Sequence, residues 1–321
     1  MVSRSLTFRS RVVLIVCIAI VGCSPLAPVS PRDSSKPSTT NTGMGASHPT
    51  TRGWANFYPL APGNLWSYDR QFTVDVFSTG LPPNRFAYQA TIEAEQTCVE
   101  SIEGRSFQIE RRRETAANGD EFVTWLRLRQ DRDGLYEYDL TGRPECEGAA
   151  SMRAQRFSDA SDPATELAAR VPEVHRGMVR AAVERELLRV TALRSVLGVI
   201  PSALASNEIQ RLQYPLQTGA EWVLRDDPHI TQRVEGADLI RTPMGNVVGY
   251  RIDLVWTGFF GPNDRVTLWY GRQGMLGLEF HLEGEATDAS GNLIGTIVSE
   301  EHQTLTALHL ENSQRFSATL P

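Results

Sequence analysis

The sequence predicts a mainly β protein in which two related antiparallel repeats, each a β-sandwich or half-barrel, are joined by a helical segment. Short alternating segments recur between turn-forming residues, one nine-residue motif occurs twice, and a helical apolar stripe lies between its copies. The expected organisation is a signal peptide over 1–22, a disordered tether over 23–53, a first β repeat over 54–150, a helical connector over 151–211 and a second β repeat over 212–321.

The first 22 residues are typical of a secretory signal peptide. Arg4, Arg9 and Arg11 precede the apolar run 12–21. A run of about ten residues is too short for a bilayer, which needs roughly 20 apolar residues. A charged start, a short apolar centre and a small residue at the end therefore indicate export from the cytoplasm.

The end of this segment, Ile20-Val21-Gly22-Cys23, resembles the bacterial lipobox, usually Leu-Ala/Ser-Gly-Cys. Gly22 and Cys23 match it, and Ile20 and Val21 keep only the apolar character. The resemblance implies cleavage before Cys23 and a covalent diacylglycerol and acyl anchor on that residue; an ordinary signal peptide with an incidental cysteine is the alternative. Ser24, in place of Asp, resembles sorting to the outer membrane. We therefore expect a lipid-anchored protein of the cell envelope, at the outer membrane and facing the periplasm.

Residues 24–53 have the composition of a flexible tether. Ser, Thr, Pro and Gly make up 19 of these 30 residues. Such a segment cannot bury enough apolar surface to offset the entropy of ordering. As a flexible coil it would reach about 30 Å from the lipid to the folded domain.

The charge is distributed unevenly along the chain. Residues 1–53 hold six basic side chains and one acidic one, whereas the remaining residues hold 26 basic and 37 acidic side chains. An acidic body argues against nonspecific binding of nucleic acid, which requires clustered cations. The membrane is therefore expected to hold this protein through lipid and not through charge.

One motif marks the start of each predicted repeat. It reads Tyr58-Pro59-Leu60-x2-Gly63-x2-Trp66 in the first copy and Tyr214-Pro215-Leu216-x2-Gly219-x2-Trp222 in the second. A later element follows in the same order: Trp125 precedes Gly134-Leu135, and Trp269 precedes Gly277-Leu278. Proline is tolerated at a strand start and glycine permits the turn before it, so the motif indicates a strand entry. Because this motif and the later Trp and Gly-Leu element occur in the same order in both halves, the sequence predicts an internal duplication.

Alternating segments after each motif predict five strands in each repeat. They are 72–77, 86–92, 106–111, 122–128 and 135–140 in the first repeat, and 231–234, 247–256, 265–270, 276–282 and 293–305 in the second. Turn signals separate them, including Asn118-Gly119 and Asp133-Gly134. Short strands at this spacing are typical of antiparallel sheets.

These motifs resemble the repeat of bacterial envelope lipoproteins known as TapB-like. The resemblance also uses Thr242-Pro243-x-Gly245; it is best over 212–305 and partial over 56–140, where Gly104 takes the place of that element. It implies a β-rich fold and an envelope location, and it implies no reaction.

The segment between the repeats is expected to be helical. Asp162-Pro163 is a start signal, Pro172 breaks or restarts the helix, and Gly198 and Pro201 supply the stop. Apolar residues follow at helical spacing, namely Val179, Val183, Leu187, Val190, Leu193 and Leu197. The opposite face holds Arg180, Glu184, Arg185 and Arg189. Because acids are interspersed there and the apolar face has no aromatic residue, we expect packing against the sheets and not against a membrane.

The sequence contains few residue patterns that indicate a catalytic, metal-binding or cofactor-binding site. Cys98 and Cys146 form an even pair in an oxidising compartment, and a disulfide between them would restrict the unfolded chain by about 4 kcal/mol in the entropic account; two free buried thiols are the alternative. The histidines show no metal-ligand spacing, and Asp131-x-Asp133-Gly134 is better explained by a hairpin turn than by a calcium loop. We therefore expect no catalytic residue, no metal and no cofactor.

These patterns predict a noncatalytic scaffold or partner-binding protein that is held at the membrane by its lipid and contacts another envelope protein. The alternative is a carrier or sensor whose curved sheet holds an apolar ligand. The repeated aromatics are expected to belong to the core in either case.

The lipid anchor gives the first testable prediction. Replacing Cys23 (Cys23→Ala) removes the only thiol that the lipobox positions for acylation, so the protein should move from the membrane fraction to the soluble fraction. Cys17→Ala is the matched control and should leave fractionation unchanged. Membrane association of the Cys23→Ala protein at the level of the native chain would contradict the anchor.

Overall fold

The computed structural model describes residues 57–138, 143–147, 163–197, 208–287 and 292–311, all within one compact unit of the chain. The predicted signal peptide, Cys23 and the tether lie outside the described residues. Neither described helix has the length and the apolar composition that crossing a membrane would require.

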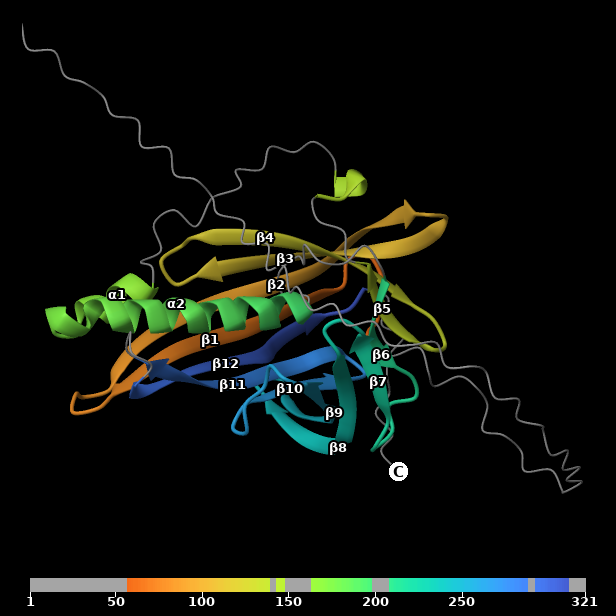
Figure 1. The fold of residues 1–321 in the computed structure, drawn as a ribbon. Coiled ribbons are helices and arrows are strands. Elements are labelled where there is room, and N and C mark those ends of the chain that lie inside the picture. Colours follow the sequence, from red (N-terminus) through yellow and green to blue (C-terminus); the bar gives the residue numbers. More distant parts are fainter. Residues whose placement is uncertain (1–56, 139–142, 148–162, 198–207, 288–291, 312–321) are drawn as a thin grey trace, which may run out of the picture. The chain divides into compact units, whose positions relative to one another are not determined.

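Twelve antiparallel strands of the described chain form one sheet, in the order β6-β5-β4-β3-β2-β1-β12-β11-β10-β9-β8-β7 (Figure 1). The strands are β1 (Leu65–Ser78), β2 (Asn84–Ile102), β3 (Arg105–Ala116), β4 (Glu121–Gln130), β5 (Gly134–Tyr138), β6 (Glu208–Gln213), β7 (Glu221–Arg225), β8 (Ile230–Thr242), β9 (Gly245–Trp256), β10 (Arg265–Gly271), β11 (Gly274–Thr287) and β12 (Leu293–His309). A short 3-10 helix, η1 (Glu145–Glu147), and two α-helices, α1 (Pro163–Ala169) and α2 (Glu173–Val196), lie between β5 and β6 in the sequence.

The sheet consists of two runs of six consecutive strands, β1–β6 and β7–β12, which meet where β1 pairs with β12. That pairing extends from Leu65 opposite His309 to Ser78 opposite Gly295. The first and last of the described strands thus share one sheet, and these strands do not divide into two separately paired sandwiches. Trp222 of β7 donates an indole hydrogen bond to the carbonyl of Gln210 in β6 at 3.2 Å, so the antiparallel sheet is a nearly closed barrel.

Each expected strand segment falls within an observed strand, apart from residues 139–140, which lie outside the described residues. Beyond these ten segments the structure has β7, which begins at Glu221 where the second motif predicts a strand entry, and β6, which begins at Glu208 inside the segment expected to be a connector. Its pairing with β5, with Leu135 opposite Leu212, is a contact between residues far apart in sequence. An alternation of only six residues gives too little signal to find such a strand.

The two motif copies form the same turn. Gly63 and Gly219 have φ angles of 88° and 82°, in the left-handed region that favours glycine. The N–H of Gly63 donates to the carbonyl of Gln96 at 2.7 Å, and the N–H of Gly219 donates to the carbonyl of Val234 at 2.7 Å. The acceptor strand shifts register next to each bond, after Gln96 in β2 and after Val234 in β8. The motif therefore specifies a local backbone geometry, while common descent of the two halves remains a prediction.

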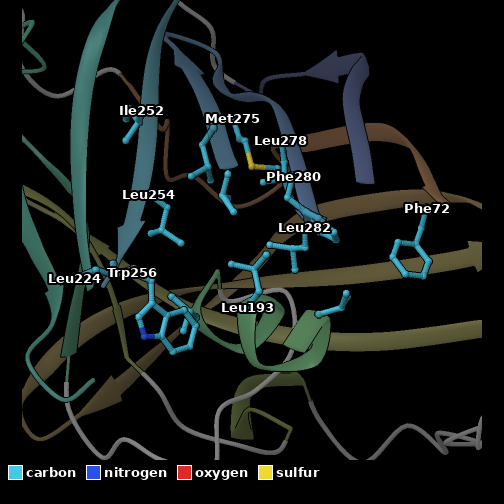
Figure 2. Packing of buried hydrophobic residues seen from close by; sticks show 14 of the residues in the cluster. Phe72, Leu193, Leu224, Ile252, Leu254, Trp256, Met275, Leu278, Phe280 and Leu282 are labelled. Atoms are coloured by element: carbon cyan, nitrogen blue, oxygen red, sulfur yellow. The ribbon is translucent and has the colours of Figure 1, made fainter. Parts of the chain in front are cut away.

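Helix α2 lies over one face of the sheet (Figure 1). We call it the inner face; it carries the buried Phe72 of β1 and Glu301 of β12, both of which Arg194 of α2 contacts. The expected apolar stripe packs there, with Val179, Val183, Val190 and Leu193 buried. Figure 2 shows Leu193 within the same apolar cluster as Leu282, Phe280 and other side chains of the sheet. The helix therefore closes the inner face with side chains.

Two glycine substitutions test the turn geometry. Gly219→Ala meets no atom within 4 Å, but it places a Cβ at positive φ, so the free energy of unfolding should fall by about 1 kcal/mol. Gly177→Ala also meets open space, yet it lies inside α2, where the same change should raise that free energy by about 1 kcal/mol. Chemical denaturation measures both free energies of unfolding. Changes of the same sign in the two variants would contradict the positive φ of Gly219 or the helical position of Gly177.

Candidate functional site

Buried charges join α2 to the inner face of the sheet. Arg194 of α2 donates to Glu301 of β12 through Nη2 at 2.6 Å and Nε at 3.1 Å. Arg70 of β1 donates to the same Glu301 oxygen at 3.0 Å and to Glu114 of β3 at 2.6 Å. The Arg194 guanidinium also lies over the ring of Phe72, 4.6 Å from its centroid. One network thus connects α2 with three strands, on both sides of the β1–β12 junction.

The electrostatics of this network favour a structural role. Burial disfavours the charge of Glu301, which is 0% exposed, but Arg194 and Arg70 outweigh it and hold its pKa below the usual range. Burial also lowers the pKa of Arg194, and Arg70 adds to this effect, while Glu301 opposes it. A carboxylate that two arginines keep ionised is a poor proton donor at neutral pH. Glu301 is therefore the counter-ion that holds the helix.

Arg189 makes a second attachment of α2. It donates through Nη2 to Asp264, before β10, at 2.6 Å, and through Nη1 to Glu186 at 3.0 Å. It also reaches the carbonyls of Phe259 and Glu283, at 3.3 and 3.1 Å. Arg189, which the sequence places opposite the apolar stripe, thus contacts the sheet and the loop between β9 and β10, because that loop folds over this part of the helix. Arg180 and Glu184 do form an exposed pair, at 2.8 Å.

The aromatic residues of the first motif belong to the core. The hydroxyl of Tyr58 donates to Glu110 at 2.5 Å, and burial together with Glu110 raises the pKa of Tyr58 well above its usual value. Its ring stacks on Trp66, with the centroids 5.2 Å apart. The indole of Trp66 donates to the carbonyl of Gln273 at 2.5 Å. These contacts connect the motif of the first half to the turn between β10 and β11.

The remaining motif residues also lie in strands or in the turns that enter them. Tyr214, Leu216 and Trp222 are buried, whereas Leu60 is partly buried against the core. Trp125 in β4 and Trp269 in β10 are half-buried. Each stands opposite an arginine of the preceding strand, because Trp125 pairs with Arg111 and Trp269 with Arg251. The structure therefore distributes the motif residues over both halves and does not gather them into one site.

The expected disulfide is present between Cys98 of β2 and Cys146 of η1. The Cα atoms are 6.2 Å apart, within the range that a disulfide bridges. Since η1 precedes the helices, the bond attaches the chain leaving β5 to the sheet. The even number of cysteines in the body of the chain and the expected oxidising compartment identified this pair from the sequence.

Asp131 forms the expected hairpin turn between β4 and β5. Its Oδ1 accepts the N–H groups of Asp133 at 2.8 Å and Gly134 at 3.2 Å. Burial opposes its charge, but hydrogen bonds from Arg129 and from these backbone groups lower its pKa. In the part of the chain that the structure describes, no three His, Cys, Asp or Glu side chains are grouped so as to hold a metal ion.

Comparisons with known proteins give weak likenesses. No family model and no curated protein matches the chain. Among solved structures, a proposed lipoprotein from Parabacteroides distasonis and a proposed exported protein with a YmcC-like fold from Bacteroides fragilis each show 9% identity and a TM-score of 0.34, covering 80% of this chain and 100% of theirs. A β-barrel-like protein of the DUF1849 type from Brucella abortus shows 9% identity and a TM-score of 0.22, covering 78% and 100%. Likenesses at this level carry no argument about function.

The Glu301 network gives a stability prediction. Glu301→Gln removes the carboxylate that Arg70 and Arg194 share and leaves Arg70 with Glu114 alone, so the free energy of unfolding at pH 7 should fall by about 3 kcal/mol. Because the pKa of Glu301 is depressed in the folded state, its stabilisation is present above the usual carboxyl pKa and is lost as pH falls through the folded value. The difference between variant and native protein should therefore shrink in acid.

The control for this measurement is the neighbouring Glu300→Gln. Glu300 is partly exposed and contacts His281 at 2.9 Å, so its loss should cost less than about 1 kcal/mol. Equal effects of the two substitutions would show that Glu301 does not hold the helix.

Proposed function

We propose that this chain is a lipid-anchored cell-envelope protein of noncatalytic scaffold or partner-binding type. The observation that carries the proposal is that α2 occupies the inner face of the sheet. Leu193 and the rest of its apolar stripe pack there, and Arg194 and Arg189 attach the helix to Glu301 and Asp264. This is the face that a carrier of an apolar ligand would use, and side chains fill it.

The proposed location is supported by two independent features. The basic start, the short apolar run and the lipobox-like end at Cys23 indicate export and lipid attachment. The Cys98–Cys146 disulfide fits an oxidising compartment. The outer membrane and the periplasm-facing side remain part of the proposal, and they rest on Ser24.

The proposed partner contact is the β8–β9 tip, which we define as Leu239, Met244 and Val248. Leu239 and Val248 stand directly opposite each other in the register and are 66% and 60% exposed. Met244 lies in the turn between these strands and is exposed as well. Apolar side chains gathered on an exposed hairpin end are more typical of a protein contact than of a solvated loop.

A crosslinking pulldown from native membranes tests the partner contact. Leu239→Gln combined with Val248→Thr removes apolar surface at the β8–β9 tip while keeping side-chain size, so the crosslinked partner should be lost and the fold retained. The control combines Leu188→Gln with Val99→Thr, which alters the same residue types at similar exposure (70% and 53%) on α2 and β2. Equal recovery of the partner with both double variants would contradict the proposed contact.

Lipid extraction of the same preparation tests the alternative function. A carrier or sensor would retain a stoichiometric apolar molecule after purification, and the helix would have to leave the inner face to admit it. A scaffold should release only the lipids of its own anchor. Recovery of a defined free lipid at one copy per chain would favour the carrier over the scaffold.

A further inference from the structure

A cavity of about 330 Å³ lies between α2 and the sheet, at the position of Glu186. Ala182 and Ile297, both buried, contribute apolar surface, and Phe259 contributes an aromatic ring. The rim holds Arg185, Glu283 and Glu285. The volume is at the lower end of the range for small-molecule sites, roughly 300–1,000 Å³.

The charges beside this cavity do not balance. Glu186 is 3% exposed, the side chain of Asp264 is 1% exposed, and both carboxylates contact the same cation, Arg189. Asp264 has further donors, because its Oδ1 accepts the N–H of Glu283 and its Oδ2 that of Gly261, both at 2.7 Å. Glu186 Oε2 accepts from Arg189 at 3.0 Å, but its Oε1 has no hydrogen-bond partner. The group therefore lacks one positively charged donor.

The surroundings of Glu186 show a carboxylate placed at the cavity. Its Oε2 lies so close to Gly284 that a Cβ at that position would stand 2.6 Å away, so only glycine leaves room for this position of the carboxylate. Burial raises the pKa of Glu186, although Arg189 opposes the rise. A buried carboxylate oxygen without a donor is costly to stability, and an ion at the site is one way in which such a group is satisfied.

We infer that this cavity binds a small primary amine, whose ammonium group donates to Glu186 Oε1 while a short apolar body lies against Ala182, Ile297 and Phe259. An ammonium supplies the missing charge and the missing donor together. A neutral hydroxyl would supply only the donor. A divalent cation would need several oxygen ligands, and Arg189 and backbone N–H groups already occupy the other carboxylate oxygens of Glu186 and Asp264.

The test titrates n-butylammonium chloride into the full-length protein in a nonionic detergent and follows binding by ligand-observed NMR and calorimetry. Butylammonium should bind saturably at one site, whereas 1-butanol and pentanoate, with the same butyl chain, should not compete. Glu186→Gln should weaken binding about tenfold or more, because it removes a charge-assisted hydrogen bond. Glu184→Gln, an exposed change on the same helix, should leave binding unchanged.

The three probes keep the inference testable on the native protein even if Glu186→Gln were to fold poorly, and circular dichroism checks its fold. Failure of butylammonium to bind, or binding equal to that of 1-butanol, would overturn the inference. Undiminished binding to a folded Glu186→Gln variant would also overturn it. These outcomes are independent of the partner contact at the β8–β9 tip.

Discussion

The pairing of β1 with β12 is the constraint on which the rest of the structure depends. Two runs of six strands meet along the full length of β1, and their inner faces therefore become one surface. A single helix can then cover residues from both runs. The Arg70, Glu114, Glu301 and Arg194 network lies across this junction, so the strand pairing and the attachment of the helix stabilise the same region.

Buried charge shapes the interior as much as apolar packing does. Removing a carboxylate and an arginine from water costs several kcal/mol for each ion unless close partners compensate. Glu301 and Glu110 are both fully buried and both have arginine partners. Such pairs add little net stability over apolar residues, but they strongly disfavour arrangements in which the partners separate. The Arg194–Glu301 pair therefore specifies where α2 lies, whereas the apolar stripe of the helix supplies most of the favourable burial. Glu186 and Glu301 each have one carboxylate oxygen without a hydrogen-bond partner, but of the two only Glu186 lines the cavity between α2 and the sheet.

This architecture explains why a scaffold or binding role is the better proposal. The inner face of a barrel-like sheet is the natural place for a ligand, yet here the chain fills it with its own helix (Figure 2). What remains for interactions is the outside, including the apolar β8–β9 tip, and the small cavity beside Glu186.

The sequence by itself determined the local features: strand segments, the two glycine turns, the helical stripe and the disulfide pair. Each depends on alternation, φ preference or parity among few residues, so neighbouring positions carry enough information. Only the tertiary structure decided that the halves share one sheet, that β6 exists, and that Arg189 and Arg194 point to carboxylates and not to solvent. Arg194 and Glu301 are 107 residues apart, and Arg70 and Glu301 are 231 apart. No periodicity encodes such pairs, because their energy arises only when the folded sheet removes both charges from water.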